Sequence, residues 1–63
     1  MDNQVKNRQI YNREIVKKIS EMVEKYPDLR FTQILLCMEI LDKKRDLFYE
    51  ESLTTLMRIK DIQ

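Results

Sequence analysis

The chain has no glycine and no histidine, and only one cysteine and one proline among its 63 residues. Glycine supplies the positive-φ positions of tight hairpin turns and of phosphate-binding loops, so its absence argues against both. Because helix-breaking residues are scarce and 37% of the residues are charged, helix is the expected backbone state. The composition therefore predicts an all-α fold.

The shortage of histidine and cysteine also limits the chemistry that the chain can carry. One thiol supports neither an intrachain disulfide nor a tetrahedral zinc site. Cys37 has no imidazole to activate it and lies in an apolar stretch, so we expect it to be buried rather than catalytic. The carboxylates between residues 42 and 51 lack the spacing and the central glycine of a calcium loop. We expect no catalytic residue, no metal and no cofactor.

The length predicts a single domain, 1–63, with a small core. A chain of this size buries only about 60% of the surface that its unfolded form exposes, and oligomerisation commonly adds the missing stability. Met1–Arg8 is polar, unlike a signal peptide, and the longest apolar run, Ile34–Met38, is far too short to cross a bilayer. A cytoplasmic protein without membrane contact, forming a homo-oligomer or binding another protein, is the expectation.

The segment Asn3–Tyr26 is predicted to form a long amphipathic helix. Its apolar residues recur at helical spacing and are expected to form one inward face: Ile15, Val16, Ile19, Met22, Val23 and Tyr26. The pattern weakens toward the N-terminus, so residues 1–10 either fray or continue as a helix that packs on something else.

A second helix is predicted over Leu29–Lys43, after a break at Pro27 and with Asp28 as its N-cap. The short link makes the first two helices an antiparallel hairpin. The second helix is apolar on nearly all sides. It is either a central core helix with some exposed apolar surface or a helix whose outer face is an interface.

The chain after residue 46 is expected to cross the hairpin and then to form a short third helix. Leu47–Tyr49 reads as an extended apolar segment, and Ser52 as the N-cap of a helix that runs to Ile62. Leu53, Leu56 and Met57 are expected to face inward. The fold class is thus a small three-helix domain.

Two stretches, Tyr26–Leu35 and Asp46–Ser52, resemble a pattern found in small uncharacterised helical proteins of bacteria and phages. The pattern is Pro-Asp-Leu-Arg-Phe-x-Gln-Ile-Leu followed by Asp-Leu-Phe-Tyr, and the resemblance spans roughly residues 26–56. Thr32 stands where many of the similar chains carry glycine. The resemblance implies a phage or prokaryotic setting and supplies no activity.

Two groups of residues are candidates for contact with a protein partner. A self-association surface is predicted from the outer face of the second helix and the end of the third: Leu36, Cys37, Ile40, Ile59 and Ile62. Arg30 and Gln33 are polar positions on the apolar second helix. Arg30 either pairs with Asp46, Glu50 or Glu51 as a structural staple or recognises a partner's carboxylate or phosphate.

These patterns favour a non-enzymatic protein–protein interaction or modulator protein, and the resemblance above implies that it is phage-encoded or prokaryotic. The alternative is a small nucleic-acid-binding or transcription-modulating protein that uses the basic half of the first helix. Its candidate contacts are Lys6, Arg8, Arg13, Lys17 and Lys18. Helix-turn-helix geometry fits poorly, because the only short turn leads into an apolar helix rather than a polar recognition helix.

Overall fold

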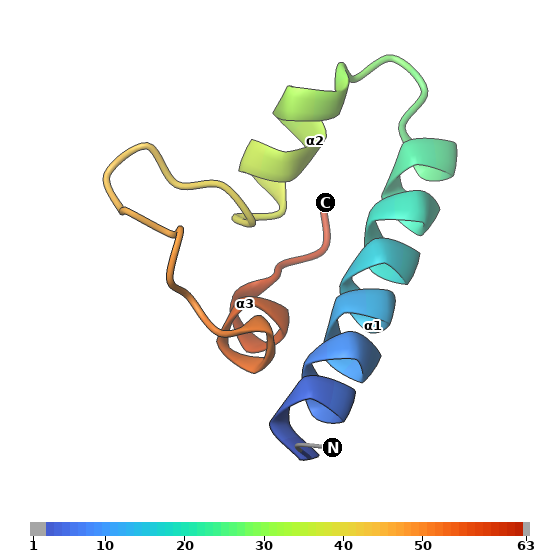
Figure 1. Ribbon diagram of the computed structural model, residues 1–63. Helices are drawn as coiled ribbons and strands as arrows, with labels where there is room; N and C mark the ends of the chain where they lie inside the picture. Colours follow the sequence, from blue (N-terminus) through green and yellow to red (C-terminus); the bar gives the residue numbers. More distant parts are fainter. Residues whose placement is uncertain (1–2, 63) are drawn as a thin grey trace.

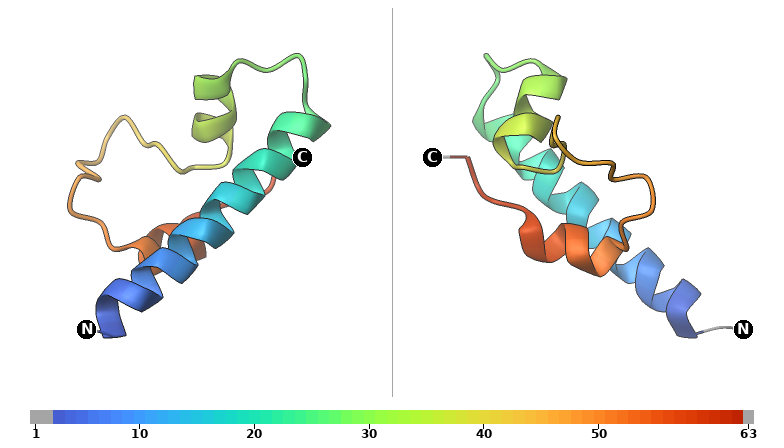
Figure 2. Two further views of the ribbon diagram at one scale, coloured as in Figure 1. Left: turned by 45° about the vertical axis from the view of Figure 1, so that its right-hand side comes forward. Right: turned by 90° about the vertical axis from the view of Figure 1, so that its left-hand side faces the viewer.

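The computed structural model describes residues 3–62, which form three helices and, within that range, no strand: α1 (Asn3–Lys25), α2 (Phe31–Cys37) and α3 (Ser52–Arg58). The predicted all-α class is confirmed. Figure 1 shows the long α1 on one side of the molecule, with α2 and α3 both on the other, and Figure 2 shows the same arrangement from two further directions. The principal extents are 42 × 26 × 15 Å, because α1 reaches beyond its neighbours.

The helix α1 agrees closely with its prediction. It ends where Pro27 removes a backbone donor, and the last helical hydrogen bond runs from the Tyr26 amide to the Met22 carbonyl oxygen at 2.9 Å. Within residues 3–10 the chain is helical, while residues 1 and 2 of the segment expected to fray lie outside the described range. No helix in the part of the chain that the structure describes has both the length and the apolar character needed to cross a membrane.

The inward face of α1 is narrower than predicted. Ile19, Met22 and Tyr26 contact the core, whereas Val16 and Val23 are exposed. Both valines lie three or four positions from Ile19, but on the opposite side of it from the buried Met22, at the edge of the apolar face. The prediction that they pack inward is therefore wrong.

The helix α2 is half as long as predicted, since it ends at Cys37 rather than near Lys43. Glu39 follows the C-cap with a φ of 61°, which is the left-handed conformation. Its amide donates to the Leu36 carbonyl oxygen and the Ile40 amide to that of Leu35, each at 3.0 Å. This hydrogen-bond pair is a Schellman motif, which usually has glycine at the left-handed position. In a chain without glycine, the helix end carried no sequence signal.

The start of α2 also differs from its prediction. Arg30, not Asp28, occupies the N-cap position, and the Arg30 amide donates to Gln33 Oε1 at 2.8 Å. This is the N3 half of a capping box, in which the third helical residue reaches back to the N-cap amide. The short turn at residues 26–30 folds α2 back against the C-terminal part of α1, as Figure 1 shows.

Residues 38–51 form a loop that is built on side-chain-capped turns. The Lys44 amide donates to Asp42 Oδ1 at 2.9 Å, and the Phe48 amide donates to Asp46 Oδ1 at 3.1 Å. The second turn directs Phe48 and Tyr49 outward, where their side chains are 83% and 86% exposed. The two rings pack edge to face, with 4.9 Å between their centroids. The expectation that this segment lies across the hairpin is wrong, because the turn ends the extended conformation.

The helix α3 ends at Arg58, four residues before its predicted end. Glu51 is the N-cap, and Ser52, predicted for that role, is the first helical residue and donates its hydroxyl to Asn12 Oδ1 of α1. After Arg58 the backbone becomes extended and passes between the other two helices. The Lys60 amide donates to the Met38 carbonyl oxygen at 2.8 Å, and the Tyr26 hydroxyl donates to the Ile62 carbonyl oxygen at 2.7 Å.

The core is very small. Met22, Ile34 and Met38 are its buried side chains, and the C-terminal segment packs Ile59 and Ile62 against them. Leu53 and Met57, which were predicted to face inward, are exposed, and only Leu56 of that set is half-buried. The extended segment 59–62 therefore replaces α3 as the element that closes the core.

Candidate functional site

The most enclosed polar cluster joins α3 to the end of α2. Arg58 Nη2 lies 2.7 Å from Glu50 Oε1, and the two side chains are 16% and 13% exposed. The same guanidinium donates to the carbonyl oxygen of Ile40 at 3.1 Å and to that of Glu39. Arg58 thus satisfies the carbonyl groups that a Schellman turn leaves free and holds the left-handed residue in place.

Glu50 is held in its charged form by this cluster. The hydrogen bonds from Arg58 and from the Thr55 hydroxyl, the latter at 2.6 Å, lower the pKa of the Glu50 carboxyl below its ordinary value. Because both oxygens of the carboxylate already accept hydrogen bonds, the cluster stabilises the loop and leaves no free acid or base.

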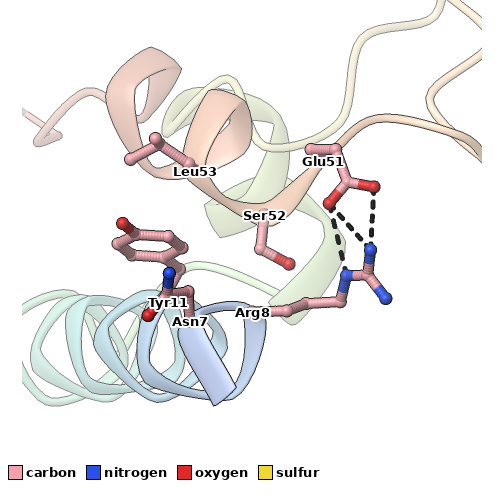
Figure 3. A pocket seen from close by; sticks show the side chains of 6 residues that line it. All are labelled: Asn7, Arg8, Tyr11, Glu51, Ser52 and Leu53. Atoms are coloured by element: carbon pink, nitrogen blue, oxygen red, sulfur yellow. Dashed lines mark hydrogen bonds and ion pairs between the residues drawn. The ribbon is translucent and has the colours of Figure 1, made fainter. Parts of the chain in front are cut away.

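A shallow hollow of about 360 Å³ lies between the N-terminal half of α1 and the start of α3. Figure 3 shows Arg8 of α1 in a bidentate ion pair with Glu51, and Tyr11 opposite Leu53. The Arg8 Nη2 to Glu51 Oε1 distance is 3.0 Å, and both side chains remain substantially exposed. The guanidinium and the carboxylate are paired with each other. We therefore interpret this hollow as part of the contact between α1 and α3.

The staple predicted for Arg30 is formed by other arginines. Among residues 3–62, the ion pairs to Glu50 and Glu51 come from Arg58 and Arg8, and none of the ion pairs involves Arg30. Arg30 is exposed at the start of α2, and Gln33 caps its amide. The structural interpretation of Arg30 is therefore wrong, and the observed role of Gln33 is to cap the start of α2.

The five residues predicted as an interface do not lie together on the surface. Ile40, Ile59 and Ile62 pack against the core, because the chain leaves α2 and α3 early and turns inward at both places. Leu36 and Cys37 are exposed. Cys37 was expected to be buried; it is exposed because the short α2 has α1 on one side only.

The basic residues of α1 divide into two groups. Arg8 is engaged by Glu51, and Lys18 is half-buried. Lys6, Arg13 and Lys17 are exposed and follow one another at intervals of seven and four residues, which places them on one side of the helix.

Apolar surface is the main feature that the structure leaves uncovered. The exposed large hydrophobic side chains form the following set: Val5, Ile10, Val16, Val23, Phe31, Leu36, Leu41, Phe48, Tyr49, Leu53 and Met57. The accessible surface is 5340 Å² for a chain of 7.8 kDa. A folded monomer of that mass exposes about 4,400 Å². The chain therefore exposes roughly 900 Å² more than a self-sufficient monomer does.

Two features escaped the sequence-based prediction. Arg58 and Glu50 are eight residues apart, and only the early end of α3 brings them together with the turn at Glu39. The outward position of Val16 and Val23 also escaped prediction, because both valines were assigned to the inward stripe. Val16 and Val23 lie three and four positions from the inward-facing Ile19, so spacing alone did not distinguish them from inward residues.

No family model, no curated protein and no solved structure matches the chain.

Proposed function

We propose that this protein is a non-catalytic binding module, whose uncovered apolar surface is the contact area for another protein chain. The observation that carries the proposal is the large accessible surface combined with a core of only three buried side chains in the part of the chain that the structure describes. Exposed apolar patches beyond the usual size mark interaction sites in soluble proteins.

The electrostatics of the chain support the same proposal. The clusters around Arg58 and Arg8 are occupied by their own ion-pair partners, so they offer a ligand no charged group. The apolar side chains, in contrast, reach from α1 to the loop at Phe48. Contact through such side chains gains free energy in proportion to the apolar area removed from water.

Photo-crosslinking in the cells that produce the protein tests this proposal. A photoreactive residue is placed at Val16, Leu36 or Phe48, which represent three parts of the apolar surface, and at Glu14, an exposed polar control on α1. We expect a protein adduct from at least one apolar position and none from Glu14. Adducts with nucleic acid alone, or none at any position, contradict the proposal.

Nucleic-acid binding is the second candidate function, and the row formed by Lys6, Arg13 and Lys17 is the observation that favours it. Each phosphate contact releases about one counterion, so a row of three gives a logarithmic salt slope of roughly −3 on duplex DNA. Titrating DNA at rising salt with the wild type and with Arg13→Gln checks this slope. Binding that is absent at low salt contradicts the candidate.

A further inference from the structure

An apolar groove runs along α1 to the start of α2. Val16 and Val23 line it on α1, with the small Ser20 between them, and Phe31 borders it on α2. Val16 and Phe31 are 60% and 57% exposed. Figures 1 and 2 show α2 and α3 on one side of α1, so a further helix has access to the rest of its length.

The charges beside this groove have a definite order along α1. Arg13 and Lys17 precede Ser20 on the side of α1 that carries Glu24, and Glu24 follows Ser20 and lines the groove. Lys17 and Glu24 are seven residues apart, so they lie on the same side of the helix, and each directly follows one of the two valines in the sequence. One half of the groove edge is therefore basic and the other half is acidic.

We infer that the occupant of this groove is a second copy of the chain, with the two α1 helices antiparallel about a twofold axis beside Ser20. That axis sets Val16 of one copy against Val23 of the other, and Lys17 against Glu24. A twofold interface requires a self-complementary surface, and this order of charges provides one. The inference rests on the proposed function and names its partner.

The area agrees with a second copy. The chain exposes roughly 900 Å² more than a monomer of its mass, and a stable interface buries about 800 Å² on each partner. Ser20 has a small side chain, so two helices are able to approach closely where they cross.

The outer surface of α2 is a poorer contact for a second copy. The hollow formed by Leu36, Leu41 and Leu47 is bordered by Lys43, Arg45 and Asp42, and Asp42 offsets the charge of Arg45 in an exposed ion pair. Two copies that met there would bring these cations together, and like charges in an interface oppose association.

Sedimentation equilibrium of the purified chain, from about 5 μM to about 500 μM, tests the inference. We expect a reversible dimer for the wild type and a monomer for Val16→Glu, with unchanged helix content by circular dichroism. Met57→Glu is the matched control, because it adds the same charge at an exposed apolar position on α3. We expect it to remain dimeric.

Charge reversal tests the antiparallel arrangement and does not depend on the fold of the Val16 variant. Lys17→Glu and Glu24→Lys are each expected to weaken the dimer roughly tenfold, because each places like charges in contact twice. The double variant K17E/E24K restores both pairs and is expected to regain wild-type affinity. Within one chain these two side chains are two helical turns apart, so the rescue requires contact between copies.

A wild type that stays monomeric at the highest concentration overturns the inference, as does a Val16→Glu dimer or a double variant without rescue. A monomer that still gives a crosslink from Val16 to a different protein rejects the second copy but leaves the binding module intact. The absence of protein crosslinks from any position rejects the proposed function itself.

Discussion

Arg58 lies 2.7 Å from Glu50 and also donates to the carbonyl oxygens of Glu39 and Ile40, so one side chain ties α3, the loop and the end of α2 together. Both charged groups are largely enclosed, and each hydrogen-bonds to other groups of the cluster. Truncating one partner of such a pair leaves the other desolvated without compensation.

Arg58→Met is therefore expected to lower the melting temperature by more than about 5 °C. Methionine keeps the aliphatic part of the side chain and removes the guanidinium. Arg45→Met is the control, since Arg45 forms an exposed ion pair with Asp42 at 3.4 Å, and such pairs contribute little. Thermal unfolding followed by circular dichroism measures both, and equal shifts would contradict the role of Arg58.

The lowered pKa of Glu50 predicts a loss of stability in acid. The unfolded chain takes up a proton near the ordinary pKa of 4.5, whereas the folded chain binds it only at lower pH. The stabilisation by Glu50 is thus complete above about pH 4.5 and is lost as the pH falls through the folded-state pKa. Denaturant unfolding at several pH values should show the difference between wild type and Glu50→Gln shrinking below pH 4.5. A difference that stays constant would contradict this assignment.

The left-handed backbone at Glu39 predicts that glycine is preferred there over alanine. A side chain at positive φ costs about 1–2 kcal/mol, and glycine avoids that cost. Glu39→Gly should be more stable than Glu39→Ala by about 1 kcal/mol in urea unfolding. Both variants lose the exposed ion pair to Lys60, so the comparison isolates the backbone. Equal stability of the two would show that the turn has another conformation.

The predictability of each element followed the strength of its local signal. The helix α1 was predicted well because Pro27 and a long apolar stripe define it. The ends of α2 and α3 were predicted too late, since Glu39 replaces the glycine that usually marks a helix end and no proline follows Arg58. The positions of Ile59 and Ile62 were then wrong as a consequence.

The candidate site was less accessible to prediction, because it depends on contacts between distant parts of the chain. Arg58 reaches Ile40 and Glu39 across about eighteen residues. The short chain led to the expectation of uncovered apolar surface. That surface was assigned to a helix reaching Lys43, but α2 ends at Cys37 and the residues after it form a loop.

The small core predicts a sharp contrast between two methionines. Met38 is 0% exposed and Met57 is 79% exposed. Met38→Ala opens a cavity and should cost about 2–4 kcal/mol, enough to unfold much of a marginal domain. Met57→Ala should change the free energy of unfolding by less than about 0.5 kcal/mol. Urea denaturation measures both, and a tolerant Met38 would show that the core lies elsewhere.

The central claim is that a second copy of the chain covers the apolar surface of α1, and the dependence of the melting temperature on protein concentration tests it most directly. If folding and association are linked, raising the concentration about 100-fold adds roughly 2.7 kcal/mol of stability. We predict that the melting temperature rises by several degrees between about 2 μM and about 200 μM. A melting temperature that is the same at both concentrations would contradict the account.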